Sequence, residues 1–121
     1  MRQLILFLTC LLFSLNSFAV RVFIDHQTFY NSETGPYLEV VFSFEGKSMK
    51  TVKKPDGQYI AQANCNLIIS QGNKVFQFAK FKASSTPSIL SNASDFMSVE
   101  RFPLDDGNYQ LEIEISDAND S

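Results

Sequence analysis

The sequence predicts an all-β protein, an immunoglobulin-like or macroglobulin-like antiparallel β-sandwich of about seven strands. Apolar and polar residues alternate in several segments, as expected when successive side chains of a strand point to opposite faces. Clusters of Gly, Pro, Asn and Asp separate these segments, and no stretch has a clear helical period. With 121 residues, of which 45% are hydrophobic, the chain is long enough for one domain.

The first 19 residues predict a secretory signal peptide. Arg2 is followed by an apolar run from Leu4 to Leu15 and by the small-x-small site Ser17-Phe18-Ala19. A retained N-terminal anchor is the alternative, and no later run is long and apolar enough to span a membrane. We therefore expect an exported protein (periplasm, cell envelope or secreted) whose single sandwich domain covers residues 20–121.

The first half of the domain predicts three strands with a polar, turn-rich segment at His26–Gly35. Apolar residues alternate most regularly between Tyr37 and Glu45, where the inward side chains are Leu38, Val40, Phe42 and Phe44. The three expected strands are Val20–Asp25, Tyr37–Glu45 and Met49–Lys54. The last of these is basic and suits a sheet edge, where lysines discourage association with another edge.

The second half predicts four strands and one long loop, Ala83–Ser94, whose Ser, Thr, Pro and Asn content argues against a helix. Cys65 lies on the apolar side of the longest strand and is interpreted as a buried small residue. Two alternatives remain open for the inward face of the expected strand Val75–Lys82: Phe76 with Phe78, or Val75 with Ala79 and Phe81. The expected strands are Gln58–Ser70, Val75–Lys82, Asp95–Leu104 and Tyr109–Ser116.

The spacing Asp105-x-Gly107-x-Tyr109 resembles the tyrosine corner of immunoglobulin-like sandwiches, in which a Tyr near the start of strand F bonds to upstream backbone. Leu111 stands where antibody domains have a cysteine, so the disulfide between the sheets is absent. These three residues are predicted to be structural. If Tyr109 opens strand F, strand G is missing and an edge is exposed; if the final strand is G, the sandwich is closed.

Further landmarks are spread over residues 20–121. They are Gly35-Pro36-Tyr37-Leu38-Glu39, the Lys54–Gly57 turn before Tyr59-x-Ala61, the Ser84–Pro87 loop, and Arg101-Phe102-x-Leu104-x-x-Gly107-x-Tyr109 ending in Ile115-Ser116-Asp117. With these features the chain resembles the N-terminal β-domain of bacterial GWxTD-domain proteins, which are exported and of uncharacterised function. The Gly-Trp-x-Thr-Asp motif is absent and the chain has no Trp. The resemblance therefore implies a fragment or a truncated copy.

The residues that usually carry catalysis are scarce. His26 is the single histidine, Cys65 is the one cysteine outside the first 19 residues, and the five glycines are scattered in turns. A lone imidazole in a polar segment is more often a surface residue than a general base. We expect no catalytic residue, no cofactor and no structural zinc site. An acidic exported chain also argues against a nucleic-acid partner.

Two ligand hypotheses form the alternative function, a glycan- or calcium-binding adhesion-type module. Asp117, Asn119 and Asp120 resemble the linker of cadherin repeats, and their oxygen atoms suit Ca²⁺. Phe29 and Tyr30 are the aromatic residues most suited to an exposed glycan platform.

The charges are segregated along the sequence, although the net charge is only −3. Seven lysines fall between Gly46 and Lys82, and most acids follow Asp95. Either the folded surface is bipolar and docks a charged partner, or the opposite charges pair across strands; we favour pairing. The sequence thus predicts a non-catalytic module that contacts protein, either the C-terminal part of the same polypeptide or another envelope protein, with no membrane span after signal cleavage.

Overall fold

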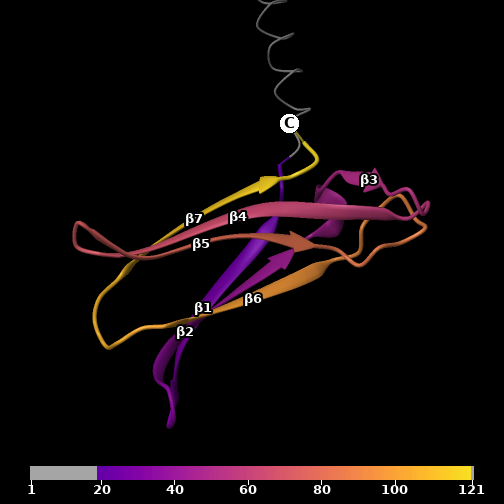
Figure 1. Cartoon of the computed structure of the whole chain (residues 1–121). Coiled ribbons are helices and arrows are strands. Elements are labelled where there is room, and N and C mark those ends of the chain that lie inside the picture. Colours follow the sequence, from indigo (N-terminus) through magenta and orange to yellow (C-terminus); the bar gives the residue numbers. More distant parts are fainter. Residues whose placement is uncertain (1–18, 121) are drawn as a thin grey trace, which may run out of the picture.

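The computed structural model describes residues 19–120, which form two antiparallel sheets (Figure 1). One sheet has the order β1-β2-β6; in the other, β4 pairs with β5, with β7 and, at its start, with β3. The all-β prediction is therefore confirmed. The strands are β1 Val22–Asn31, β2 Gly35–Phe44, β3 Thr51–Lys53, β4 Tyr59–Gln71, β5 Lys74–Ser84, β6 Phe96–Pro103 and β7 Gln110–Asp117.

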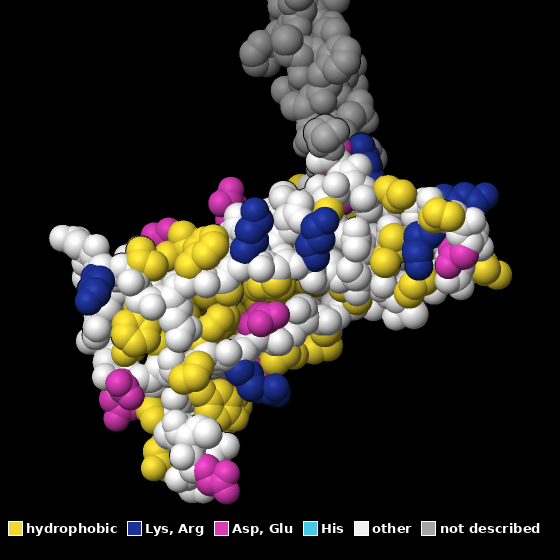
Figure 2. Space-filling view, viewed as in Figure 1, with side chains coloured by type: hydrophobic (Ala, Val, Ile, Leu, Met, Phe, Trp, Pro, Cys, Tyr) yellow, Lys and Arg dark blue, Asp and Glu magenta, His cyan; other side chains and the backbone are white. Residues whose placement is uncertain are grey.

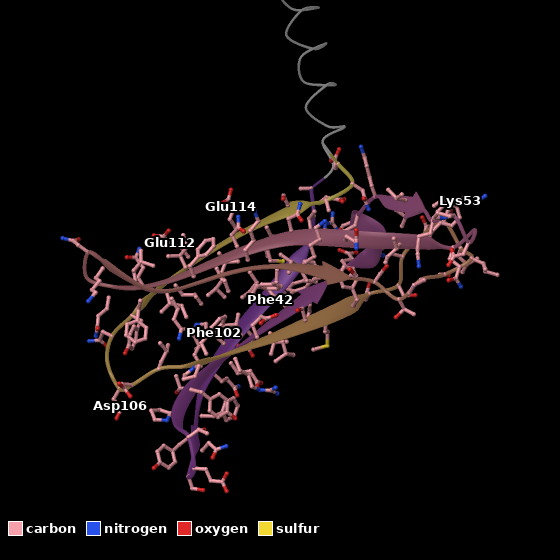
Figure 3. All side chains as sticks on the ribbon, viewed as in Figure 1. Phe42, Lys53, Phe102, Asp106, Glu112 and Glu114 are labelled. Atoms are coloured by element: carbon pink, nitrogen blue, oxygen red, sulfur yellow. The ribbon has the colours of Figure 1, made fainter. Side chains whose placement is uncertain are left out.

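The core lies between the two layers and is built from their alternating inward residues. The expected inward face of β2 is confirmed, because its four residues are buried, and so is the burial of Cys65 on β4. The apolar face of β4 is buried from Ala61 to Ile69, whereas Tyr59 at its start is only half-buried. The ring of Phe42 lies 5.5 Å from that of Phe81, edge to face, so the two sheets interlock there. Figure 3 shows Phe42 between the layers. The buried residues from β2 and β4 are Leu38, Val40, Phe42, Phe44, Ala61, Ala63, Cys65, Leu67 and Ile69.

The first strand is longer than expected, so the prediction of a turn-rich segment at His26–Gly35 is wrong for most of its length. β1 continues to Asn31 and pairs with β2 from Val22↔Phe44 to Asn31↔Gly35. The turn is confined to residues 32–34, where Asn31 Oδ1 accepts a hydrogen bond from the backbone N–H of Glu33 at 2.8 Å. β1 is an edge strand with little cover, so polar residues are tolerated on its inner face and the sequence alternation is lost.

The orientation of β5 settles the alternative left open by the sequence. Ala79 and Phe81 pair with the buried Leu67 and Cys65 and point inward, whereas Phe78 points outward and is 60% exposed. A register shift between Ile69 and Ser70 changes the pairing beyond this point. Val75 and Phe76 are also exposed, so the alternative with Ala79 and Phe81 is correct except at Val75.

The third strand is shorter than expected. β3 covers Thr51–Lys53 only, because Gly46–Ser48 forms a 3₁₀ turn and Met49 is buried. A Cβ added at Gly46 would collide with the carbonyl oxygen of Ala93, so only glycine fits beside this loop.

The Ala83–Ser94 segment contains no helix, as the sequence predicted. β5 takes its first two residues, and the chain then follows the edge of β4. The Ser85 N–H donates to Ala61 O, and the Ala61 N–H donates to Ser85 Oγ, both at 2.9 Å. An isolated bridge between Tyr59 and Ser88 continues this track.

The expected signal peptide, apart from Ala19, lies outside the described residues. Within residues 19–120, no helix has the length and apolar character needed to cross a membrane.

Candidate functional site: the open edge beside β7

The turn before β7 has the geometry expected of a tyrosine corner. Tyr109 Oη donates a hydrogen bond to the backbone oxygen of Asp105 at 2.9 Å. Gly107 lies under the Tyr109 ring, and a Cβ there would stand 3.4 Å from that ring and 3.0 Å from Gln71 Nε2. The ring of Phe76 packs edge-on against Tyr109, with centroids 5.7 Å apart. The three predicted corner residues thus come together and set where β7 begins.

β7 has a strand on one side only. It pairs with β4 from Gln110↔Ser70 to Asp117↔Ala63, and no other described strand pairs with it. Just beyond the strand, the Ala118 N–H donates to Gln62 O at 2.8 Å, which fixes the phase of the ladder. Hydrogen-bonded and non-hydrogen-bonded pairs alternate in an antiparallel ladder. The backbone N–H and C=O groups of Leu111, Ile113 and Ile115 therefore face the open side.

The inner face of β7 is only half-buried. Leu111, Ile113 and Ile115 pack against the core but keep part of their surface exposed. An edge strand has no neighbour on one side, so its side chains bury less apolar surface than those of a strand inside the sheet. These apolar residues remain available for further burial.

The inner face of β1, in the other sheet, is also uncovered. Ile24 and Thr28 pair with the buried Phe42 and Leu38 and so share their inward direction, yet both are exposed. His26 occupies the same face, opposite Val40. Ile24 lay in the expected first strand, but His26 and Thr28 were assigned to a turn-rich segment because of their polarity. The turn at Gly35 and the alternation of β2 together could have placed them on a strand.

Hollows lie at both ends of β7. One of about 450 Å³ is lined by His26 and Thr28 of β1 and by Tyr109 and Leu111 at the start of β7, with Leu38 and Ile69 at its floor. Another of about 350 Å³ lies at the far end of β7. Its lining includes Val20, Ile115 and Asp117. We call the space along β7, from Tyr109 to Asp117, the β7 groove.

The outer face of β7 is acidic. Glu112 and Glu114 project away from the interior (Figure 3), and neither forms an ion pair within residues 19–120. Asn66 of β4 pairs with Lys80 on one side and with Glu114 on the other. Lys80 and Glu114 are therefore two strand spacings, or about 10 Å, apart. Figure 2 shows Lys and Arg side chains along the front of this layer and apolar side chains in the hollow between the layers.

Pairing of opposite charges between the basic and acidic segments is limited. Among residues 19–120, only the Lys50–Asp120 pair, at 2.8 Å, joins a lysine of Gly46–Lys82 to an acid after Asp95. The favoured expectation of extensive cross-strand pairing is therefore wrong for most of these residues. Lys80 and Glu114 lie on different edge strands with β4 between them, and this separation prevents contact.

The residues of the calcium hypothesis are tied to Lys50 instead of facing a common centre. Asp117 accepts from the Lys50 N–H at 2.8 Å and from the Asn119 N–H at 2.9 Å, and Asn119 Nδ2 donates to Lys50 O. Asp120 Oδ1 accepts from Lys50 Nζ, and this bond raises the pKa of Lys50. Within residues 19–120, no three His, Cys, Asp or Glu side chains are grouped to hold a metal ion.

The two aromatic residues of the glycan hypothesis lie on opposite faces of β1. Phe29 stacks on Tyr37 with centroids 5.5 Å apart, on the outer face of its sheet. Tyr30 follows it in the strand, points to the other side and is 75% exposed. They do not form one platform.

Comparison of the chain with models of protein families, with curated proteins and with solved structures gave no match. The β7 groove is therefore interpreted from its geometry alone.

Proposed function

We propose that this chain is a non-catalytic, exported β-sandwich module of a bacterial envelope or secreted protein, and that it acts through contact with another protein segment. The observation that carries the proposal is the open edge of β7 beside the uncovered inner face of β1. Unpaired strand edges flanked by apolar surface are used in proteins for strand addition.

The immunoglobulin-like form of the sandwich is part of the proposal. In that fold one sheet contains strands A, B and E and the other contains C, F and G. The order β1-β2-β6 corresponds to A-B-E, and the pairing of β4 with β7 corresponds to C with F. The bond from Tyr109 to Asp105 supports the assignment of β7 as strand F. The β7 groove then occupies the place of strand G.

The relation to the N-terminal β-domain of GWxTD-domain proteins remains a proposal. The turn and core residues that carry it occupy structural positions: Gly35 and Gly57 have φ of 87° and 90°, and Phe102 is buried. The partner segment would belong either to the C-terminal part of a longer polypeptide or to another envelope protein.

Site-specific photo-crosslinking in cells that export the protein tests the contact role. A photoreactive residue would replace Glu114 on β7, Phe78 on the outer face of β5 or Glu33 in the β1–β2 turn, all of which are exposed. A discrete protein adduct at one of these positions supports the proposal. Absence of adducts at every position, with the protein folded and exported, contradicts it.

Export is tested separately. A fusion of the whole chain to alkaline phosphatase without its own leader should be active, because that enzyme requires the oxidising compartment. Replacing Leu11 and Leu12 of the apolar run by Arg should abolish this activity. Activity that is unaffected by these substitutions would contradict the signal-peptide assignment.

A further inference from the structure

We propose that the β7 groove binds an extended segment of a partner protein that adds as a strand antiparallel to β7, with apolar residues facing the groove and basic residues facing out. This inference rests on the proposed contact function and gives it a site, a register and a partner chemistry. The partner is recognised by its backbone and by the alternation of its side chains.

The backbone groups set the register. Leu111, Ile113 and Ile115 present their N–H and C=O groups to the open side, since their neighbours bond to β4. An added antiparallel strand would form hydrogen-bonded pairs with these three residues. Every strand pair in the two sheets is already antiparallel, so the added strand continues the existing geometry.

The β7 groove favours apolar side chains on the inward face of the partner strand. Residues placed opposite Leu111, Ile113 and Ile115 point to the same face as those side chains, into the space between the two sheets. The hollows at the two ends of β7 have room for side chains of this kind. Apolar residues there would remove half-buried surface of β7 from water.

The acidic outer face of β7 determines which outward side chains the partner strand should carry. It also disfavours pairing of two copies of this chain through β7. Residues opposite Glu112 and Glu114 lie beside two carboxylates that have no ion pair in the described chain. Lys or Arg fits there. Antiparallel pairing of two β7 strands centred on Ile113 would place Glu112 directly opposite Glu114 of the other copy, and like charges opposite one another are destabilising.

The edges on the opposite side of the molecule carry features that discourage strand addition. β5 has a register shift near its start and exposed Lys80 and Lys82. β6 ends at Pro103 and directs Glu100 inward, opposite Val40. The segment Gln110–Asp117 has no Lys, no Pro and no register shift in its pairing. This contrast favours the β7 edge over the edges of β5 and β6.

Fluorescence anisotropy with synthetic peptides tests the proposal. The probe is a labelled Thr-Val-Lys-Val-Lys-Val-Thr peptide added to the purified protein, which should bind. Its backbone N-methylated form, which cannot complete the ladder, should not bind. Glu114→Lys should weaken binding of the probe about fivefold, because an attraction becomes a repulsion. Glu33→Lys makes the same charge change in the β1–β2 turn and should leave binding unchanged.

A charge exchange sharpens the test. The double variant Glu112→Lys/Glu114→Lys should prefer Thr-Val-Glu-Val-Glu-Val-Thr over the lysine peptide, reversing the preference of the unmodified protein. Equal binding of the N-methylated peptide, or an equal effect of Glu33→Lys, would overturn the proposal. So would an equilibrium-sedimentation mass of two copies for the protein alone, if Glu114→Lys changes that mass.

The two proposals fail in different ways. If neither peptide binds but crosslinks form at Phe78 or Glu33, the β7 groove is not the docking site and the contact function stands. If no position on the exported protein gives an adduct, the contact function itself is contradicted.

Discussion

The hydroxyl of Tyr109 donates a hydrogen bond to the backbone oxygen of Asp105, four residues earlier and 2.9 Å away. This bond closes the turn that carries the chain from β6 to β7, the crossing from one sheet to the other. The bond therefore helps to set where β7 begins, while the ladder with β4 holds the rest of the strand.

Replacing Tyr109 with Phe removes only the hydroxyl and should lower the free energy of unfolding by about 1 kcal/mol. Tyr109→Ala also removes the ring that packs against Phe76, and should cost about 2 kcal/mol because the ring is half-buried. Urea denaturation followed by circular dichroism measures both. No loss for Tyr109→Phe would show that the hydrogen bond contributes nothing, and equal losses for the two variants would show that the ring packing contributes nothing.

Phe42 is fully buried and contacts the aromatic rings of Phe44 and Phe81. Phe42→Ala should lower the free energy of unfolding by about 4 kcal/mol, through lost burial and the cavity left behind. Phe23→Ala is the matched control, since Phe23 is 75% exposed, and should change it by less than about 0.5 kcal/mol. Comparable effects of the two substitutions in urea titrations would contradict the assigned core.

Burial raises the pKa of the Cys65 thiol to about 11 from its ordinary 9.0, with a smaller contribution from Glu100. The raised pKa means that the folded state keeps its proton in a range where the unfolded state loses it. The contribution of the protonated thiol to the free energy of unfolding is fully present below pH 9.0 and is lost as the pH rises toward about 11. The stability difference between the unmodified protein and Cys65→Ala should therefore shrink over that interval in urea titrations.

The buried thiol should also resist labelling. At about pH 8, a thiol reagent should modify Cys65 slowly in the native protein and at once in urea, because the thiolate is the reactive form and the residue is fully buried. Rapid modification of the native protein would show that β4 opens readily.

The two carboxylates after β7 should differ in importance. Asp117→Ala leaves the Lys50 and Asn119 N–H groups without their acceptor and should cost about 1.5 kcal/mol. Asp120→Ala removes an exposed ion pair with Lys50 and should cost less than about 0.5 kcal/mol. Thermal unfolding ranks the two variants. A larger effect of Asp120→Ala would mean that the ion pair, and not the Asp117 cap, fixes this end of the sheet.

The parts of the fold that the sequence predicted well are strands with one dry and one wet face. β2 and β4 lie inside their sheets, so Val40 and Leu67 had to be apolar and their neighbours did not. His26 and Thr28 are inward residues of an edge strand, where burial is weak and polarity carries no penalty. The register shift near Ser70 likewise hid the orientation of Phe78, because it depends on the pairing and not on the local sequence.

The candidate site divides in the same way. The corner at Asp105 and Tyr109 is local, and its spacing is visible in the sequence. The β7 groove joins residues far apart in the chain, such as Thr28 and Leu111, and its existence follows from which strands are neighbours. Alternation along a strand identifies the inner face but not the strand that covers it.

In the second sheet, β3, β5 and β7 each pair with β4 and with no other described strand. β5 follows β4 after a two-residue turn, whereas β7 begins 39 residues after Gln71. Closing the short loop costs little entropy and the long one more, so we expect the β4–β5 hairpin to form early in folding and β7 to dock late. The amides of β4 should then be the last to exchange with solvent deuterium. Those of β7 should exchange earlier, through a local opening of the sheet that has the lowest free energy.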